Sequence, residues 1–334
     1  MVNTMAKKRC ALVTTGGTIA SKVDPSTGLA MSVLGGEALL ESLQLMQRPI
    51  NMDVEIHEVT NVSSLYISSE HWVSLHNTIQ DLLKREDIEA VIVSHGTAVL
   101  EETAWFLDLT IRSDKPVIVI GAQRNTSDYD TDGPRNLYNA LLLAEHPDAR
   151  GKGVLVTLNN HINAAREVTK SHTVDVETFQ SGEWGYLGSI VNTTVRFHRA
   201  PLRRLHVPLK PEMALPKVDI ACMYAGADGG LLEAAVDLGA VGMVVQAVAS
   251  GHVNKELFQA VERVLAKGVP VVIATRIPRG GTRPGYGFEG SSQRLIEAGA
   301  VLSGDLSAWK ARILLMLVLQ NNQADRQSLT RLFD

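Results

Sequence analysis

The feature of this sequence that most constrains its fold is an alternation between short apolar runs and longer stretches with helical spacing. The apolar runs cover residues 10–14, 90–94, 116–120 and 154–158, and the helical stretches cover residues 36–45, 69–84, 100–108 and 133–144. In the stretch 69–84, the apolar residues that define one buried helix face are Trp72, Leu75, Ile79 and Leu82. Because β-branched runs are typical of buried parallel strands and each such strand needs a helical connection, the alternation predicts an α/β fold with a parallel sheet.

A change of composition near residue 200 predicts a division into two domains. The stretch 197–211 contains three prolines and scattered basic residues, which is typical of a linker on the surface. After it the alternation resumes, with strands expected from Val218, at 242–245 and at 269–274, and helices expected at 230–238, 255–267 and 308–321. We therefore expect a larger N-terminal parallel-sheet domain at 1–199, a linker at 200–216 and a smaller C-terminal α/β domain at 217–334.

Composition and charge exclude several classes of protein. The 334 residues are 45% hydrophobic and carry a formal net charge of -4, so neither nucleic-acid nor membrane binding is expected. Cys10 and Cys222 both fall in apolar runs, which predicts small core residues and no disulfide. The apolar run after Arg9 is too short for a signal sequence, so we expect a cytoplasmic protein.

Three polar clusters follow the ends of predicted parallel strands, where open α/β sheets bind ligands. The first is 14–20, in which Gly16 and Gly17 allow a sharp turn and Thr18 would expose its hydroxyl. A capping threonine in a glycine-rich turn is the structural alternative. The turn is not a phosphate-binding loop, because no Gly-Lys-Ser/Thr ending follows.

The second cluster, 94–103, also follows a β-branched strand and opens a helix. Thr97 could cap this helix, with Glu101 and Glu102 in its first turn, or it could act in catalysis. For His95, a hydrogen-bonded core position is the expectation rather than a catalytic base.

The third cluster, 168–173, contains Lys170. A lysine is ordinarily a solvated surface charge. In a cleft, however, desolvation lowers its pKa and makes it a base that can activate a hydroxyl nucleophile. Together the three clusters are compatible with a hydrolase that uses a hydroxyl nucleophile.

Five ordered motifs resemble the bacterial L-asparaginase/glutaminase family, whose members are threonine-nucleophile amidohydrolases. The motifs are Thr15-Gly-Gly-Thr-Ile-Ala, His95-Gly-Thr with the Leu100 helix, Asp132-Gly-Pro-Arg-Asn-Leu-Tyr-Asn-Ala, Val168-Thr-Lys and Lys310-Ala-Arg-Ile-Leu-Leu. The resemblance implies a small amide substrate, most simply L-asparagine, no metal or other cofactor, and a homodimer or a homotetramer built as a dimer of dimers.

The resemblance also implies roles for individual residues. Thr18 falls at the nucleophile, Thr97 at the second catalytic threonine and Lys170 at the lysine that partners it. Ser64 resembles the serine that holds the substrate's α-carboxylate, with Ser63 as a close competitor. The list of expected substrate-binding residues is completed by the neighbours of Thr97, which are Gly96 and Ala98.

Four departures from the family bear on the substrate. Ala98 stands where the family has an aspartate that binds the α-ammonium of asparagine, and Val99 replaces the next threonine. Leu29 is the best match to the flexible-loop tyrosine, and Ser250-Gly-His252 replaces an asparagine-rich turn. Glu289 is a candidate for the acid that a neighbouring subunit contributes. Three functions therefore stay open: an L-asparaginase, a hydrolase of another small amide without a free α-ammonium, and a non-catalytic ligand-binding relative.

Overall fold

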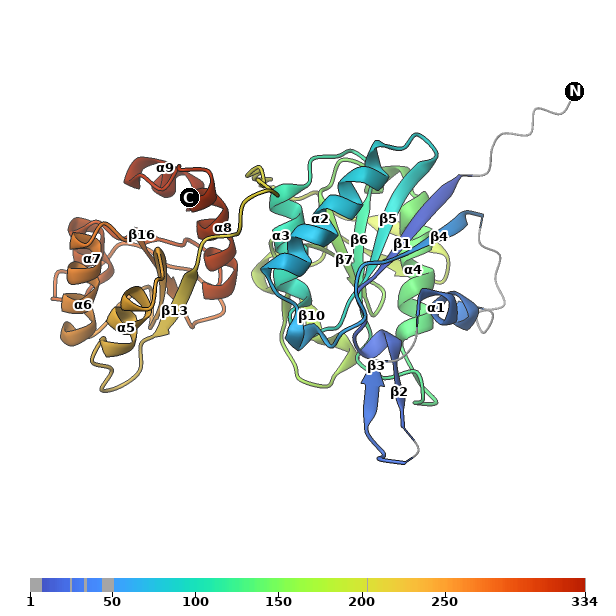
Figure 1. Ribbon diagram of the computed structural model, residues 1–334, viewed down its shortest axis with the longest axis horizontal. Helices are drawn as coiled ribbons and strands as arrows, with labels where there is room; N and C mark the ends of the chain where they lie inside the picture. The colour runs from blue at the N-terminus through green and yellow to red at the C-terminus, as the bar shows by residue number, and fades with distance from the viewer. Residues whose placement is uncertain (1–7, 25, 33–34, 44–50, 203, 334) are drawn as a thin grey trace, which may run out of the picture. The chain divides into compact units, whose positions relative to one another are not determined.

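The computed structural model describes residues 8–24, 26–32, 35–43, 51–202 and 204–333. The chain forms two compact units, Met1–His206 and Val207–Asp334, each with its own sheet (Figure 1). The predicted linker and domain boundaries at 199 and 217 stay a prediction.

The first unit is built on an eight-stranded sheet in the order β12-β11-β8-β7-β6-β5-β1-β4. The parallel strands are β1 (Arg9–Thr14), β4 (Asp53–Glu58), β5 (Ile88–Ser94), β6 (Val117–Ile120) and β7 (Val154–Leu158). The sequence analysis missed the parallel edge strand β4 and three antiparallel strands that extend the sheet, β8 (His161–Ala164), β11 (Gly188–Val191) and β12 (Thr194–Phe197). The predicted fold class, a large and mainly parallel N-terminal sheet, is confirmed.

Helices complete the core of this unit. They are α1 (Gly36–Ser42), α2 (Ser69–Lys84), α3 (Leu100–Thr110) and α4 (Gly133–Glu145), with short 3-10 turns η4 (Pro147–Ala149), η5 (Val176–Thr178) and η6 (Gly182–Trp184). Leu39 of α1 and Leu137 of α4 share one buried cluster with the strand residues Leu12 and Ile92. Helices α2 and α3 pack on each other through Trp72 and Phe106, whose stacked rings have centroids 5.2 Å apart.

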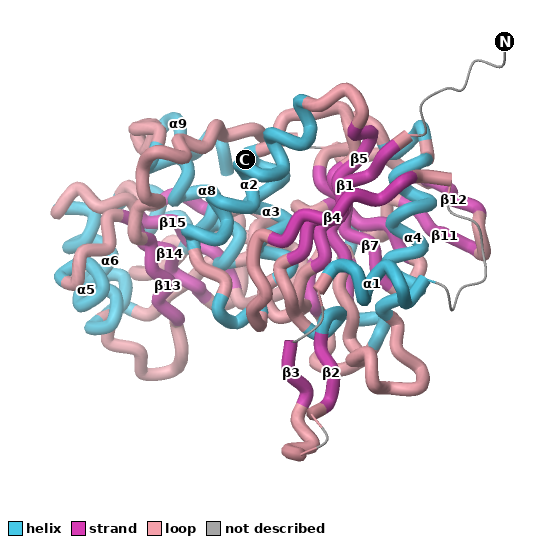
Figure 2. The backbone as a smooth tube through the Cα atoms, turned by 45° about the vertical axis from the view of Figure 1, so that its right-hand side comes forward, coloured by secondary structure: helices cyan, strands magenta, loops and turns pink. Residues whose placement is uncertain are grey.

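Smaller elements lie around the ends of the strands. They are the hairpin β2 (Ser21–Val23) and β3 (Ala30–Ser32), the turns η1 (Thr18–Ala20) and η3 (Ser64–Tyr66), and the pair β9 (Thr169–Lys170) and β10 (Phe179–Gln180). Figure 2 shows the β2–β3 hairpin extending away from the main sheet. Residues 44 and 45 of the helix predicted at 36–45 lie outside the described residues.

The second unit has a four-stranded parallel sheet in the order β13-β14-β15-β16. Its strands are β13 (Val218–Cys222), β14 (Gly242–Ala247), β15 (Val271–Thr275) and β16 (Val301–Leu302), and its helices are α5 (Gly230–Asp237), α6 (Lys255–Ala266), α7 (Ser292–Ala298), α8 (Ala308–Gln320) and α9 (Arg326–Phe333). This smaller α/β unit also confirms the predicted fold class.

The prediction for the two cysteines is half right. Cys10 is fully buried in β1, whereas Cys222 is exposed on β13, so the core position predicted for Cys222 is wrong. The physical reason is that β13 is an edge strand of its sheet and part of it is left uncovered. Both cysteines are free thiols.

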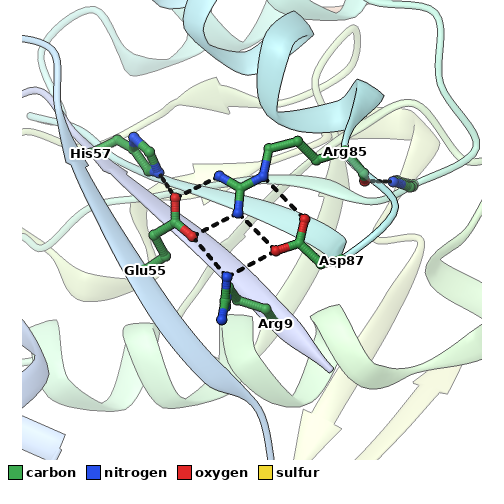
Figure 3. A network of polar contacts seen from close by, with 6 residues as sticks. Arg9, Glu55, His57, Arg85 and Asp87 are labelled. Carbon is green, nitrogen blue, oxygen red and sulfur yellow. Dashed lines mark hydrogen bonds and ion pairs between the residues drawn. The ribbon is translucent and has the colours of Figure 1, made fainter. Parts of the chain in front are cut away.

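A network of charged side chains ties β1 and β4 to the turn before β5 (Figure 3). Arg85 donates to both carboxylate oxygens of Glu55, at 2.7 and 2.9 Å, and also to Asp87. Arg9 bonds both acids and His57 bonds Glu55. Hydrogen bonds from Arg85 hold the pKa of Glu55 down to about 2. The network therefore fixes the edge of the sheet through ionised groups.

Within the residues that the structure describes, no helix is long and apolar enough to span a membrane.

Candidate active site

The first loop of the site is fixed by the end of β1 and by two glycines. Thr15 donates from its backbone N–H and from its Oγ1 to the carbonyl of Ser94, at 3.1 and 3.0 Å, which joins the ends of β1 and β5. Gly16 and Gly17 then turn the chain with φ angles of 94° and 88°, in the region that favours glycine. A Cβ atom added to Gly17 would lie 2.2 Å from the Cα of Gly96. The two glycine backbones are therefore in direct contact, and this brings the first and second predicted clusters together.

Thr18 begins the 3-10 turn η1 directly after this contact, and the residue in the cap position is Gly17. The alternative interpretation of Thr18 as a capping threonine is therefore wrong. Its neighbour Ile19 is buried, and Ser21 donates its hydroxyl to the Gly17 carbonyl at 2.9 Å. Thr18 is consequently held in a fixed turn beside the Gly96–Thr97 segment.

Thr97 is not the cap of the following helix. The cap position of α3 is occupied by Val99, without a side-chain hydrogen bond, and Thr97 lies two residues earlier. Thr97 is buried, and its Oγ1 lies 2.8 Å from the Nζ of Lys170. The helix-capping alternative for Thr97 is thus wrong, which leaves its hydroxyl for the contact with lysine.

Lys170 is half-buried on β9 rather than a solvated surface charge. Its Nζ donates to two neutral oxygens, the Oγ1 of Thr97 and the Oε1 of Gln123 at 3.0 Å. Its backbone N–H donates to the Oε1 of Glu101, which fixes the strand against α3. Desolvation by burial lowers the pKa of Lys170 from its ordinary value. The lysine therefore has the environment of a usable base.

His95 is a buried, hydrogen-bonded core residue, as expected. Its Nδ1 lies 2.7 Å from the Gly96 carbonyl, so this nitrogen carries the proton and donates. Its Nε2 then accepts from the hydroxyl of Thr103 at 3.0 Å, and Thr103 accepts from the indole N–H of Trp72 at 2.9 Å. This chain of bonds holds the carbonyl of Gly96, the residue between His95 and Thr97.

Of the two candidate serines, Ser64 is the one in contact with the other clusters. Ser64 is buried at the start of η3, and its Oγ accepts from the backbone N–H of Ala98 at 3.3 Å. A Cβ atom added to Gly96 would lie 2.6 Å from this oxygen. Ser63 precedes the turn and is only partly buried.

The remaining sequence candidates are one residue of the first unit and three of the second. Leu29 is exposed in the connection between β2 and β3. In the second unit, His252 contacts the hydroxyl of Ser250 and accepts from the N–H of Ser292. Glu289 forms an ion pair with Lys255 at 3.2 Å. That Glu289 serves a neighbouring subunit stays a prediction.

Sequence reasoning missed Gln123, which follows β6 and contacts Lys170. Its Nε2 donates to the carbonyls of Thr173 and Asp175, at 3.4 and 3.2 Å. Its backbone N–H donates to the carboxylate of Asp132 at the start of α4. The available signal was its position, because Gln123 also lies just past the end of a parallel strand, like the three clusters that were noted.

In the part of the chain that the structure describes, no group of three or more His, Cys, Asp or Glu side chains is placed to hold a metal ion. The Thr97 hydroxyl and the desolvated Lys170 amine form a pair that can activate a hydroxyl, and the turn that carries Thr18 lies against Gly96. The fold is that of a two-unit α/β protein in which the polar clusters after β1, β5 and β8 are gathered in the first unit.

Comparisons with known proteins specify the family. Residues 9–203 match the family model "Asparaginase, N-terminal", and residues 217–333 match "Glutaminase/Asparaginase C-terminal domain". The chain belongs to the asparaginase family. The resemblance noted in the sequence, and the prediction of an asparaginase-type amidohydrolase, are confirmed at this level.

Individual relatives cover nearly the whole chain. An L-asparaginase of Bacillus licheniformis is 36% identical over 93% of this chain and 95% of its own length. A probable periplasmic L-asparaginase of Haemophilus influenzae is 36% identical over 92% of this chain and 87% of its own length. The crystal structure of a probable cytoplasmic L-asparaginase from Campylobacter jejuni superposes with a TM-score of 0.88 at 32% identity, over 98% of this chain and 99% of that one.

Proposed function

We propose that this protein releases ammonia from the side-chain amide of a small carboxamide, with L-asparagine, which gives L-aspartate, as the reference substrate. The observation that carries the proposal is the 2.8 Å contact between the Lys170 Nζ and the Thr97 Oγ1 beside the Gly16–Gly17 turn. Relatives named as L-asparaginases, each at least 36% identical over more than nine-tenths of this chain, support the amide as the reacting group.

The proposed mechanism divides hydrolysis into two steps. The Thr18 hydroxyl attacks the amide carbon and the C–N bond breaks. The amide nitrogen takes up the proton that Thr18 loses and leaves as ammonia, and an acyl ester remains on Thr18. A water molecule activated near Thr97 and Lys170 then attacks the ester, and the acid leaves as the Thr18 hydroxyl is restored. Lys170 acts as the base because its pKa is lowered by desolvation. Backbone N–H groups of the glycine turns stabilise the oxyanion.

Binding of the substrate is assigned to the buried segment around Ser64. We propose that Ser64 binds the carboxylate of the substrate and that Gly96 and Ala98 line the site, with Ser63 as the alternative carboxylate ligand. Ser64 is favoured because its oxygen lies beside both Gly96 and Ala98.

The contacts of Lys170 favour a second candidate function. In the described residues the side-chain nitrogen of Lys170 contacts only uncharged oxygens, and the side chain at position 98 is a methyl group. Position 98 therefore offers no carboxylate to a free α-ammonium next to this lysine. An amide that keeps the carboxylate but lacks the amino group, such as succinamate, is therefore the second candidate substrate.

The test is ammonia release from L-asparagine, L-glutamine, D-asparagine and succinamate, with the Thr18→Ala protein as the blank. Release that Thr18→Ala abolishes supports the nucleophile, and the better substrate decides between the two candidates. Binding of asparagine with no release by the natural protein would instead show a ligand-binding relative and refute the proposal.

The setting of this activity is also proposed. We infer a cytoplasmic homodimer or homotetramer without a cofactor. The location alone is supported by the Campylobacter jejuni relative described as cytoplasmic. The mass in solution by light scattering and cell fractionation test these points. A monomer, or recovery from the periplasmic fraction, would contradict them.

A further inference from the structure

We propose that Gln123 is a positioning residue that orients the amino group of Lys170 toward the Thr97 hydroxyl without adding a negative charge beside it. The inference rests on the proposed function, because it explains how the lysine of that site would act as a base. Gln123 is not one of the motif residues that point to the family, and its role emerges only from the folded contacts.

The hydrogen bonds fix which atom of the Gln123 amide faces the lysine. Its Nε2 donates to the carbonyls of Thr173 and Asp175, which can only accept, so its Oε1 must be the atom directed at Lys170. Its backbone N–H is tied to the Asp132 carboxylate. Gln123 is thus held at both ends, and its oxygen can only accept a hydrogen bond.

This geometry orients the nitrogen of Lys170. An amide oxygen takes one N–H of the lysine without supplying the negative charge that would favour an ammonium group. The second contact, Thr97 Oγ1, can either donate or accept. When the lysine is neutral, its remaining lone pair can accept the Thr97 hydroxyl proton, which is the direction of transfer that a base requires.

The titratable groups on the segments around the lysine have other partners. Glu101 on α3 accepts from the backbone N–H of Lys170 and from the Thr169 hydroxyl, both on β9. Asp132, the residue before α4, accepts from backbone N–H groups and from Asn136. In the connection after β9, the imidazole of His172 and the carboxylate of Asp175 each accept from backbone N–H groups. The lowered pKa of Lys170, caused by burial, agrees with this arrangement.

The decisive variant is Gln123→Glu, which keeps the shape of the side chain and adds a carboxylate beside the lysine. An opposite charge at this distance raises a lysine pKa by about 1–3 units. We expect the acidic limb of the kcat–pH profile to move up by at least about one pH unit, and kcat at pH 7 to fall roughly tenfold and recover at higher pH. The matched control Gln327→Glu adds the same charge on α9 of the second unit and should leave the limb in place.

A direct titration separates this inference from the proposed function. The carbon next to the Lys170 nitrogen is followed by NMR in protein labelled with carbon-13 lysine and assigned with Lys170→Met. A higher lysine pKa in Gln123→Glu than in the natural protein supports the inference even if none of the tested amides is hydrolysed. An unchanged lysine pKa, or a Gln123→Glu enzyme that is faster at pH 7, would overturn it while leaving amide hydrolysis intact.

Discussion

The backbones of Gly17 and Gly96 touch, so that a Cβ atom on Gly17 would lie 2.2 Å from the Cα of Gly96 and 2.3 Å from its nitrogen. This contact joins the turn that presents Thr18 to the turn that presents Thr97. Neither backbone can move aside easily, because Thr15 is bonded to the end of β5 and the Gly96 carbonyl is bonded to His95.

Gly17→Ala is expected to abolish amidase activity and to lower the free energy of unfolding by roughly 2 kcal/mol or more, because the methyl group meets backbone atoms and the φ angle is unfavourable. Gly28→Ala is the matched control, since its φ angle is 68° but a Cβ atom there meets nothing within 4 Å. Urea unfolding and ammonia release on both variants measure the difference. Equal effects of the two substitutions would show that backbone strain alone is responsible.

The second prediction concerns pH and His95. Burial lowers the pKa of His95 to about 4. The unfolded chain, with a histidine pKa near 6.5, therefore binds more protons than the folded chain between pH 6.5 and pH 4, so stability rises with pH across this window. The contribution of His95 to the free energy of unfolding is about 3 kcal/mol at neutral pH, and it is fully lost only below about pH 4.

Calorimetry at pH 7 and pH 4.5 checks this with His95→Asn, which keeps a donor toward the Gly96 carbonyl. The variant should lose less stability on acidification than the natural protein, although His76, whose pKa burial also lowers to about 4, continues to contribute. Identical pH dependence in the two proteins would rule out the buried neutral imidazole as a cause.

The third prediction concerns the ion pairs at the sheet edge (Figure 3). The pKa of Glu55 is held down to about 2, chiefly by hydrogen bonds from Arg85. The stability that ionised Glu55 adds to the folded state is therefore present above pH 4.5 and is lost as the pH falls toward 2. Because these side chains are partly exposed and screened, Glu55→Gln should cost only about 1 kcal/mol at low salt, and less in 1 M salt. Thermal melts at two salt concentrations measure this, with the exposed Glu212→Gln as the control. A loss of stability that does not respond to salt would argue against an electrostatic origin.

The fourth prediction concerns the substrate and Ala98. Its backbone N–H contacts Ser64, and its side chain offers no charge. If the site is otherwise of the family type, Ala98→Asp should raise kcat/KM for asparagine by roughly ten- to a hundredfold through a charge-assisted bond to the α-ammonium. Succinamate, which has no ammonium, should not gain. A lower rate with asparagine would indicate a site rebuilt for another amide.

Local signals allowed most of the central strands and the helices that connect them to be predicted, whereas β4, α7, β16 and α9 were missed. The stretch 69–84 was expected to be helical from its apolar spacing, and the observed helix has the same ends because Ser68 and His71 form a capping box and Arg85 is extended. The antiparallel strands were missed because they are short. The left-handed residues Asn159, Asn160 and Asn192 at their turns were the available signal.

The site was less predictable than the fold because its contacts join distant residues. Thr18, Thr97 and Lys170 were proposed from their positions after strands and from the family motifs, and the structure adds the contact between the last two. Gln123 is 47 residues away from Lys170 in the sequence, and no local pattern marks that pair. Cys222 was misplaced because an apolar run does not reveal whether its strand lies at the edge of a sheet.

The packing of Gly96 between Gly17 and the Ser64 side chain also has a consequence for refolding. Three segments separated by dozens of residues must dock before the turns that carry Thr18 and Thr97 come together. Helices such as α2 can form earlier, because their contacts are local. On dilution from denaturant, the return of amidase activity should therefore lag behind the far-ultraviolet circular dichroism signal. The rate at which activity returns then measures the last long-range step of folding.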